Sequence, residues 1–405
     1  MQSLSSTPVL RHRPFLLFLV ARMATSMAFQ MLGVAVGWQI YALTASPMYL
    51  GFVGLAQFLP MFLLTLVVGH VADRYDRRAI ARICQIIQGL SACGLAWASF
   101  SGWQTKESIL VIIFIVGAAR AFEGPALQAL LPGLVPVEIF PRAAAWSTSA
   151  LQTATIIGPA VGGFLYEAGA TAVYSASGVL FLAASVCIGL VTVQRLATKH
   201  EPVSFRSVFA GISFIRSRKE ILGAISLDLF AVLLGGATAL LPVYARDILK
   251  TGPWGLGLLR SAPAAGALTM SVFLARWPLR HRVGRTMFRA VAVFGTATLV
   301  FAVSTSFPLS FAALAVLGAS DVISVVIRHS LVQIRTPDAM RGRVSAVNAM
   351  FIGTSNQLGE FESGLTAALF GTVPAVMIGG VGTIAVVVLW MRLFPQLAQV
   401  DTLDQ

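Results

Sequence analysis

The sequence has little charge for its length. Only 11% of its 405 residues are charged, whereas soluble domains carry roughly 25%. Acidic residues are the scarcer kind, because 16 Asp and Glu stand against 29 Lys and Arg and leave a net charge of +13. Hydrophobic residues make up 57% of the chain, and the mean hydropathy is +0.82. This composition excludes a soluble protein, and no nucleic-acid partner is expected, because such a partner needs a soluble basic surface.

Several chemical signatures are also missing. The three cysteines, Cys84, Cys93 and Cys187, lie inside apolar segments without metal-ligand spacing and are expected to be packing residues. None of the lysines follows a glycine, so the chain has no phosphate-binding loop and ATP-driven transport by this chain alone is unsupported. No His, Cys and acid cluster resembles a metal site, and no nucleophile–base pair suggests an enzyme. We therefore expect no enzymatic activity, no cofactor and no metal.

Long apolar runs dominate what remains. A membrane-spanning helix needs about 20 mostly apolar residues. Twelve segments meet this requirement, at approximately residues 14–42, 48–72, 79–101, 108–131, 143–167, 171–193, 219–246, 254–276, 287–305, 308–334, 344–369 and 371–394. The sequence predicts an all-α membrane protein with twelve transmembrane helices.

One connection is longer than the others. Residues 194–218 are basic, and within them the apolar positions from Phe205 to Ile215 recur at helical spacing. This pattern is typical of an amphipathic helix that lies on the membrane surface. The sequence therefore predicts a six-helix bundle over residues 1–193, a cytoplasmic linker over 194–218 and a second six-helix bundle over 219–405.

The basic residues indicate the orientation. With the N-terminus placed inside, the outward loops hold only Lys106, Arg246 and Lys250. Most of the other Lys and Arg residues fall in inward loops and ends, with four arginines inside the helices. Short cytoplasmic loops carry an excess of Lys and Arg, so both termini are predicted to be cytoplasmic.

The two predicted halves repeat. At an offset of 201 residues, glycine, proline and arginine positions coincide: Gly51 with Gly252, Gly54 with Gly255, Gly117 with Gly318, Pro136 with Pro337, Arg142 with Arg343, Gly158 with Gly359 and Gly163 with Gly364. A constant offset indicates duplication of one six-helix unit. Duplicated halves of this kind place a substrate site between them, near the bilayer midplane.

Three short motifs lie in the first half. A basic loop after the second helix contains Gly69, Ala72, Asp73, Arg74, Arg77 and Arg78. The fourth helix contains Arg120, Glu123 and Gly124, and the fifth contains Gly158, Pro159, Gly162 and Gly163. Together these motifs resemble the major facilitator superfamily of secondary transporters over nearly the whole chain, with the fifth-helix motif resembling that of antiporters. The RYDRR form of the loop and the run Gly359 to Gly364 are most similar to the enterobactin-exporter and macrolide-efflux branch.

The resemblance implies a conformational latch at the basic loop. Gly69 has no Cβ and permits close helix approach. Asp73 can accept hydrogen bonds from a helix N-terminus and pair with a nearby arginine, closing the cytoplasmic side in one state. Arg74, Arg77 and Arg78 are candidate latch residues, although Arg77 and Arg78 could equally be plain topology determinants. Asp76 stands where the family has glycine, and we expect it to pair with Arg77 or Arg78. The corresponding loop of the second half, Arg276–Arg285, is basic but lacks an aspartate.

The fifth-helix motif has a physical rationale as well. Pro159 removes one helical hydrogen bond, and Gly162 and Gly163 remove side-chain bulk, so this helix can bend and slide against a partner. The alternative is a static proline kink.

Charges inside the apolar segments are candidate functional residues, because such charges are expensive in a membrane. The candidates for proton coupling or for the substrate cavity are Arg22, Arg120, Glu123, Asp228, Arg260, Asp321, Arg328, Asn356 and Glu360. Depth along the helices suggests that Arg22 pairs with Glu123, Asp228 with Arg328 and Arg260 with Glu360. A desolvated carboxylate can exchange a proton against a substrate or an arginine. The alternative is that these are permanent structural ion pairs.

The sequence thus predicts a monomeric, lipid-embedded secondary transporter of a bacterial inner membrane that exports a small molecule by alternating access in exchange for protons. The resemblance implies a siderophore-like or amphiphilic drug-like substrate. An importer or facilitator of the same fold is the alternative, although the fifth-helix motif argues against it. A non-transporting membrane sensor is a further alternative, and no signalling domain outside the membrane supports it.

Overall fold

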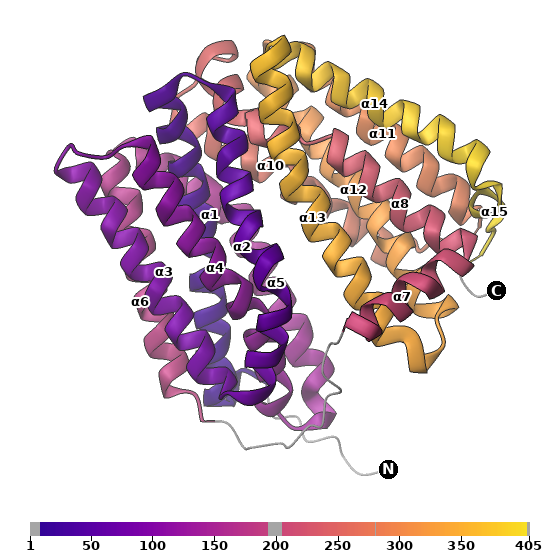
Figure 1. Ribbon diagram of the computed structural model, residues 1–405, viewed down its shortest axis with the longest axis horizontal. Helices are drawn as coiled ribbons and strands as arrows, with labels where there is room; N and C mark the ends of the chain where they lie inside the picture. Colours follow the sequence, from indigo (N-terminus) through magenta and orange to yellow (C-terminus); the bar gives the residue numbers. More distant parts are fainter. Residues whose placement is uncertain (1–8, 193–204, 280, 403–405) are drawn as a thin grey trace. The chain divides into compact units, whose positions relative to one another are not determined.

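A computed structural model describes residues 9–192, 205–279 and 281–402 of the chain. For residues 65–66, 69–70, 72–73, 205–208 and 339 it describes the backbone only. All regular structure in these ranges is helical, without a strand (Figure 1). The predicted all-α fold is confirmed for this part of the chain.

The helices group into two compact units. The first unit contains residues 1–36 and 59–202, and the second contains residues 37–58 and 203–405. The division falls inside α1 (Arg13–Thr44) and α2 (Pro47–Arg74), so the turn that joins these two helices belongs to the second unit. Residues 193–204 lie outside the described residues, and they include positions 194–204 of the predicted linker.

The first unit is built from α1 and α2 together with α3 (Arg77–Phe100), α4 (Lys106–Leu130), α5 (Phe140–Tyr166) and α6 (Ala170–Leu190). Three short 3-10 turns accompany them: η1 (Val9–Arg11), η2 (Leu131–Gly133) and η3 (Val137–Ile139). The core of this unit gathers Phe15, Phe18, Leu130 and Ile188, all of them buried.

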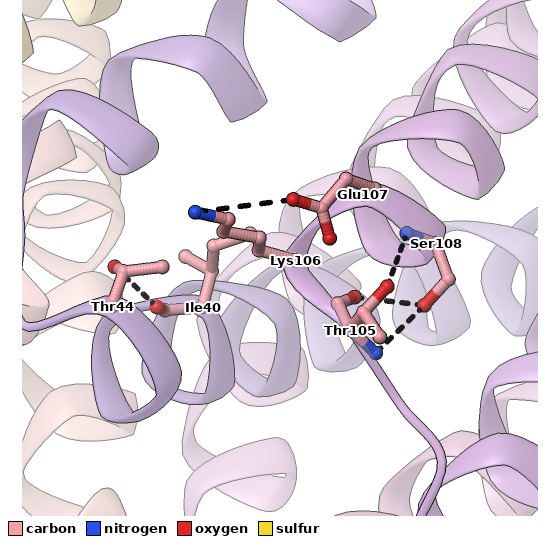
Figure 2. A network of polar contacts seen from close by, with 6 residues as sticks. All are labelled: Ile40, Thr44, Thr105, Lys106, Glu107 and Ser108. Atoms are coloured by element: carbon pink, nitrogen blue, oxygen red, sulfur yellow. Dashed lines mark hydrogen bonds and ion pairs between the residues drawn. The ribbon is translucent and has the colours of Figure 1, made fainter.

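The start of α4 shows how local sequence sets a helix end. The Thr105 hydroxyl accepts a hydrogen bond from the Ser108 N–H at 3.2 Å, and the Thr105 N–H donates to the Ser108 hydroxyl at 3.1 Å (Figure 2). This reciprocal capping box satisfies two backbone donors that have no partner inside the helix. The exposed ion pair of Lys106 and Glu107, 3.9 Å apart, lies beside it.

The second unit contains α7 (Phe205–Ser217), α8 (Lys219–Leu234), α10 (Pro253–Arg276), α11 (Val283–Val303), α12 (Phe307–Arg335), α13 (Asp338–Phe370), α14 (Thr372–Leu393) and α15 (Pro395–Gln399). Between α8 and α10 lie three short helical pieces: η4 (Ala237–Leu240), α9 (Leu241–Val243) and the π-helix η5 (Tyr244–Ile248). Its core includes Leu227, Met287, Ile327 and Leu331, which are all buried.

The predicted helix over residues 219–246 is interrupted. α8 ends at Leu234, and the helix resumes after the pair Gly235–Gly236. A Cβ placed on Gly236 would lie 2.6 Å from the backbone oxygen of Gly359 on α13. The break therefore lets two backbones approach more closely than any other residue type would permit.

The amphipathic helix expected around Phe205–Ile215 is present as α7. Part of its apolar face packs on protein, because Ile212 and Ile215 join a cluster with Val344 and Val347 of α13. A Cβ on Gly211 would lie 3.0 Å from the backbone oxygen of Arg343. Phe209, in contrast, is 66% exposed and remains available to a membrane surface.

The repeat that the sequence predicts is visible in the two units. α6 begins after Gly169, whose φ is +102°, and α14 begins after Gly371, whose φ is +94°. A left-handed backbone at both positions calls for glycine. α3 packs against α6 in the first unit, and α11 packs against α14 in the second (Figure 1). Equivalent helices therefore pair in the same way.

By length and composition, ten helices of the described chain could cross a membrane. Two other long helices, α5 and α13, are less apolar and are not among the ten. They occupy equivalent places in the repeat, and they carry the Gly158 motif and its counterpart Gly359. The ten spans confirm a multi-pass membrane protein, while the count of twelve stays a prediction.

Candidate functional site

The basic loop of the sequence is shorter in the structure than the sequence suggests. α2 continues to Arg74 and α3 begins at Arg77, so only Tyr75 and Asp76 are non-helical. The side chain of Asp76 accepts a hydrogen bond from the Arg78 N–H at 2.9 Å and caps α3. Its carboxylate lies 3.9 Å from the Arg78 guanidinium, which is one of the two ion pairs considered for it.

Two arginines of this region hold helix ends within the first unit. Arg77 donates to the backbone oxygen of Ala129 at 3.1 Å, near the end of α4. Arg78 donates to the backbone oxygen of Val191 at 2.8 Å, just after α6. The last carbonyls of a helix lack intrahelical donors and favour cations, so these contacts stabilise both ends. Arg77 and Arg78 thus have a structural role that is independent of any latch.

For two of the other predicted latch residues, the structure describes the backbone only. Gly69 and Asp73 lie in the backbone of α2, but their side-chain surroundings are outside the described residues. Arg74 is exposed at the end of the same helix. The latch therefore stays a prediction.

The glycines of the fifth-helix motif lie where α5 meets α1. A Cβ on Gly158 would lie 2.8 Å from Cβ of Gln30, and one on Gly162 would lie 2.8 Å from Cα of Met31. Gly163 and Pro159 are buried beside them, and α5 continues through the proline as one helix. At this motif the backbone of α5 therefore packs directly against α1, because the glycines have no side chains to separate the two helices.

The second unit repeats this contact without the proline. Gly359 on α13 is the counterpart of Gly158, and a Cβ there would lie 2.9 Å from the backbone oxygen of Leu233 on α8. Glu360 takes the place that Pro159 has in the first unit. Close packing of these helix pairs is therefore common to both units, whereas the proline belongs to the first.

The first-unit charge cluster consists of Arg22, Arg120 and Glu123. Glu123 on α4 is 2% exposed. Its two carboxylate oxygens accept hydrogen bonds from the side-chain amides of Gln85 at 3.0 Å and Gln88 at 2.7 Å. Both glutamines belong to α3 and are fully buried. The carboxylate is therefore held by neutral amides.

The two arginines of this cluster interact with Glu123 electrostatically. Neither guanidinium makes a hydrogen bond or an ion pair with a described residue. Arg120 stacks on Phe29 of α1, with its guanidinium carbon 3.6 Å from the ring centroid. Arg22 leaves its Nε buried without a partner. The expected pairing of Arg22 with Glu123 is thus electrostatic and lacks direct contact.

The second-unit charge cluster consists of Asp228, Asp321 and Arg328. The Arg328 guanidinium donates to the Asp228 carboxylate, and their side chains are 2% and 5% exposed. The expected pairing of these two residues is therefore present. Asp321 precedes Arg328 on α12 and interacts electrostatically with both members of the pair. It has no ion pair of its own among the described residues.

A small cavity adjoins this cluster. It is lined by Asp228, Asp321, Ser324 and Phe294, among others, and has room for about one water molecule. The Ser324 hydroxyl is buried without a hydrogen-bond partner. A water molecule in this cavity would lie beside the Asp321 carboxylate.

The remaining predicted residues lie elsewhere in the second unit. Arg260 on α10 and Glu360 on α13 interact electrostatically, as their expected pairing requires, without a close ion pair. Asn356 on α13 is exposed. About two turns earlier on the same helix, Asn348 is 2% exposed and its Oδ1 has no partner among the described residues.

Sequence reasoning missed several residues that the structure places at these sites. Gln85 and Gln88 hold Glu123, and their i, i+3 spacing in an otherwise apolar helix was the signal that could have identified them. In the second unit the Tyr41 hydroxyl donates to Asp247, and Arg246 donates to the Tyr41 carbonyl at 3.3 Å. No sequence pattern links Tyr41 to the π-helix η5.

Apolar helices long enough to span a membrane, with charged residues inside them, define a polytopic membrane protein. No group of three or more potential metal ligands occurs in the described part of the chain. The chain belongs to the transmembrane secretion effector family of the major facilitator superfamily, because the profile of that family matches residues 4–405. The superfamily resemblance of the three motifs is confirmed.

Curated relatives agree with this family. The chain is 26% identical over 397 residues to the enterobactin exporter EntS of Citrobacter koseri, covering 95% of this chain and 93% of the relative. It is 25% identical to EntS of Salmonella typhimurium and 24% identical to EntS of Escherichia coli O1:K1, with the same coverage. These relatives are consistent with a multi-pass protein of the bacterial inner membrane.

Solved structures share the fold. A bacterial homologue of the human lysosomal transporter Spinster, in an inward-facing conformation, superposes with a TM-score of 0.74 at 12% identity over 97% of both chains. A bacterial homologue of the iron transporter ferroportin gives 0.72 at 16% identity, over 97% of this chain and all of the other. At these identities the likeness concerns the fold alone.

Proposed function

We propose that this chain exports a small molecule in exchange for protons, by alternating access. The direction is supported by the family description and by the exporter names of the relatives. The resemblance of the Gly158–Gly163 motif to that of antiporters supports exchange. The reaction moves a proton inward and a substrate outward, without a covalent step.

The observation that carries the proton part is the second-unit charge cluster. Asp228 and Arg328 neutralise each other, and Asp321 adds a second carboxylate without a second guanidinium among the described residues. An excess of negative charge inside an apolar helix bundle is costly, and a proton removes it. The adjoining cavity has room for about one water molecule, which supports the binding of a proton at this site. Asp321 is therefore the proposed proton-binding residue, with Asp228 and Arg328 setting its surroundings.

The proposed architecture has twelve spans, with both termini in the cytoplasm. The ten apolar helices supply ten of them, and α5 and α13 supply the other two. Residues 1–193 and 219–405 form the two six-helix bundles and 194–218 form the cytoplasmic linker, in a monomer surrounded by lipid. Lower apolarity of α5 and α13 fits helices that line an aqueous path rather than lipid.

The moving parts are proposed to be the latch and the fifth-helix motif. Asp73, with Gly69, Arg74, Arg77 and Arg78, closes the cytoplasmic side in one state. The bare contact of α5 with α1 allows small sliding motions, because glycines leave no interlocking side chains there.

The proposed substrate is siderophore-like or an amphiphilic drug-like molecule. A siderophore-like substrate is supported by the relatives, which are named enterobactin exporters. Arg22, Arg120, Glu123, Arg260, Glu360 and Asn356 are the proposed polar residues of the substrate path.

Flux in proteoliposomes tests this function. Purified full-length protein is reconstituted with the proton-sensitive dye pyranine inside, and iron-free enterobactin or ethidium is added on one side. An imposed pH gradient should drive uptake of the substrate against its gradient, with protons moving the opposite way.

A protonophore should abolish this uptake. Uphill flux that survives the protonophore would rule out proton coupling. Flux in the same direction as the protons would instead identify an importer, and a chain that changes conformation on binding but moves no substrate would identify a sensor.

A further inference from the structure

The first-unit charge cluster is unbalanced in the direction opposite to the second. Arg22 and Arg120 bring two positive charges, and Glu123 brings one negative charge. The carboxylate is hydrogen-bonded by Gln85 and Gln88 rather than by either arginine. Among the described residues of this cluster, one positive charge is therefore left over.

One face of α1 is arranged around this excess. Arg22, Thr25 and Phe29 follow each other at spacings of three and four residues, which places them on one side of a helix. The Thr25 hydroxyl accepts a hydrogen bond from Gln85 at 3.2 Å, and Phe29 lies under the Arg120 guanidinium. This face therefore meets α3 and α4 at Glu123.

The Arg120 guanidinium lies over the Phe29 ring, with its carbon 3.6 Å from the ring centroid. An aromatic ring attracts a cation over its face and leaves the N–H groups at the edge of the guanidinium available. Those N–H groups match the oxygens of a carboxylate or phenolate in a bidentate arrangement. Arg22 supplies a second unused donor, because its Nε is buried without a partner.

An excess guanidinium differs from an excess carboxylate in one respect. A carboxylate loses its charge by binding a proton, whereas a guanidinium keeps its proton in proteins. Only an anion can neutralise the excess in the first unit. We propose that Arg22 and Arg120 bind a small organic anion, its carboxylate or phenolate oxygens on the guanidinium edge of Arg120. This inference rests on the proposed transport function and assigns the charge of its substrate.

Glu123 then limits the strength of binding. With it, the cluster has one excess charge, and without it the cluster would have two. A transported ligand must bind well enough to enter and weakly enough to leave. A Glu123→Gln variant keeps one side-chain oxygen, which still accepts from one of the two glutamines. Its new amide donates to the unpaired Oε1 of the other glutamine after that side chain flips, so the variant keeps both hydrogen bonds.

Equilibrium binding with a matched pair of probes tests the inference. The fluorescent anion 1-hydroxy-2-naphthoate and its uncharged methyl ester are titrated at neutral pH against the full-length protein in lipid nanodiscs. Wild-type protein should bind the anion at least about tenfold more tightly than the ester. Arg120→Gln should bring the two probes to equal affinity, and Arg120→Lys should retain part of the difference.

Glu123→Gln is the decisive variant. The anion should bind several-fold more tightly to it than to wild type, while the ester binds unchanged. A residue with only a structural role would weaken both probes alike. Unfolding temperature and gel-filtration profile are measured for each variant, and Glu138→Gln serves as the exposed acid-to-amide control.

Equal affinity of wild type for the two probes, no binding of the anion, or unchanged preference in Arg120→Gln would each overturn the inference. Proton-coupled flux of the cation ethidium together with equal probe affinities would overturn the anion site and leave the exporter in place. Preferential anion binding without any coupled flux would instead support the site and contradict the exporter.

Discussion

The two units share a pattern of helix packing but carry opposite charge in their interiors. In the first, one carboxylate faces two guanidiniums. In the second, two carboxylates face one guanidinium, and one of the carboxylates is ion-paired with it. The glycine contacts of α1 with α5 and of α8 with α13 are equivalent in position. The repeat thus preserves where backbones meet and leaves the buried charge free to diverge.

This difference separates two tasks. An excess carboxylate is a site for a proton, and an excess guanidinium is a site for an anion. An exporter that exchanges a substrate for protons needs both.

The ends of the equivalent helices α3 and α11 differ in a similar way. Asp76 caps α3 from the residue next to it, whereas the second-half loop has no aspartate. The structure supplies one from a distance, because Asp401 accepts a hydrogen bond from the Arg282 N–H at 2.9 Å. Two backbone hydrogen bonds, from Val283 and Gly284 to the same C-terminal segment, reinforce this contact.

The largest expected effect on stability comes from the second-unit ion pair. Arg328→Leu leaves the buried Asp228 carboxylate without its guanidinium partner, and breaking such a buried pair costs about 3–5 kcal/mol of unfolding free energy. Arg22→Leu in the first unit removes surplus charge and should change the unfolding free energy by less than about 1 kcal/mol. Chemical denaturation in detergent measures both, and equal losses would remove the distinction between the clusters.

The glycine contacts should behave alike in the two units. A Cβ at Gly158 or Gly359 would meet neighbouring atoms at 2.8 or 2.9 Å, and overpacking of this kind costs about 1–3 kcal/mol. Gly94 on α3 provides the control, because nothing lies within 4 Å of its added Cβ. Gly94→Ala should stabilise the helix by about 0.5–1 kcal/mol. A large loss at one glycine and none at the other would show that the repeat does not extend to packing.

The caps should differ between the units. Asp76→Ala removes the only side-chain cap of α3 and should cost about 0.5–2 kcal/mol of unfolding free energy. Asp401→Ala should cost less, because the backbone bonds of Val283 and Gly284 remain. Unfolding midpoints of the two variants, measured in the same buffer, show which variant loses more stability. A larger loss for Asp401→Ala than for Asp76→Ala would contradict this comparison.

The smallest effect is a pH dependence at the start of α11. The Arg282 N–H and the adjacent His281 ring hold the pKa of Asp401 below its usual value of 3.8. A lowered pKa means that the contact contributes stability above about pH 4 and loses it as the pH falls further. Amide hydrogen exchange at residues 282–284, corrected for intrinsic rates, should therefore accelerate below that pH. The same acceleration in Asp401→Asn would show that another group is responsible.

Three features could be predicted from the sequence, because each depends on a local property. Apolar length indicated a membrane protein, motif spacing indicated the family, and depth along the helices indicated the ion pair of Asp228 with Arg328. The surroundings of Glu123 could not, since depth suggested Arg22 as its partner and two amides from α3 took the hydrogen bonds. The cap from Asp401 was also hidden, because it comes from a segment 119 residues away. Contacts between distant helices depend on tertiary packing that no short pattern records.

The central claim is that anion binding and proton binding are divided between the two charge clusters. The most direct measurement compares wild type with Asp321→Asn for probe binding in nanodiscs and for proton flux in pyranine-loaded proteoliposomes. We predict that Asp321→Asn keeps the wild-type affinity for 1-hydroxy-2-naphthoate and loses substrate-driven proton movement. Retained proton movement in this variant, or loss of anion binding together with it, would contradict the account.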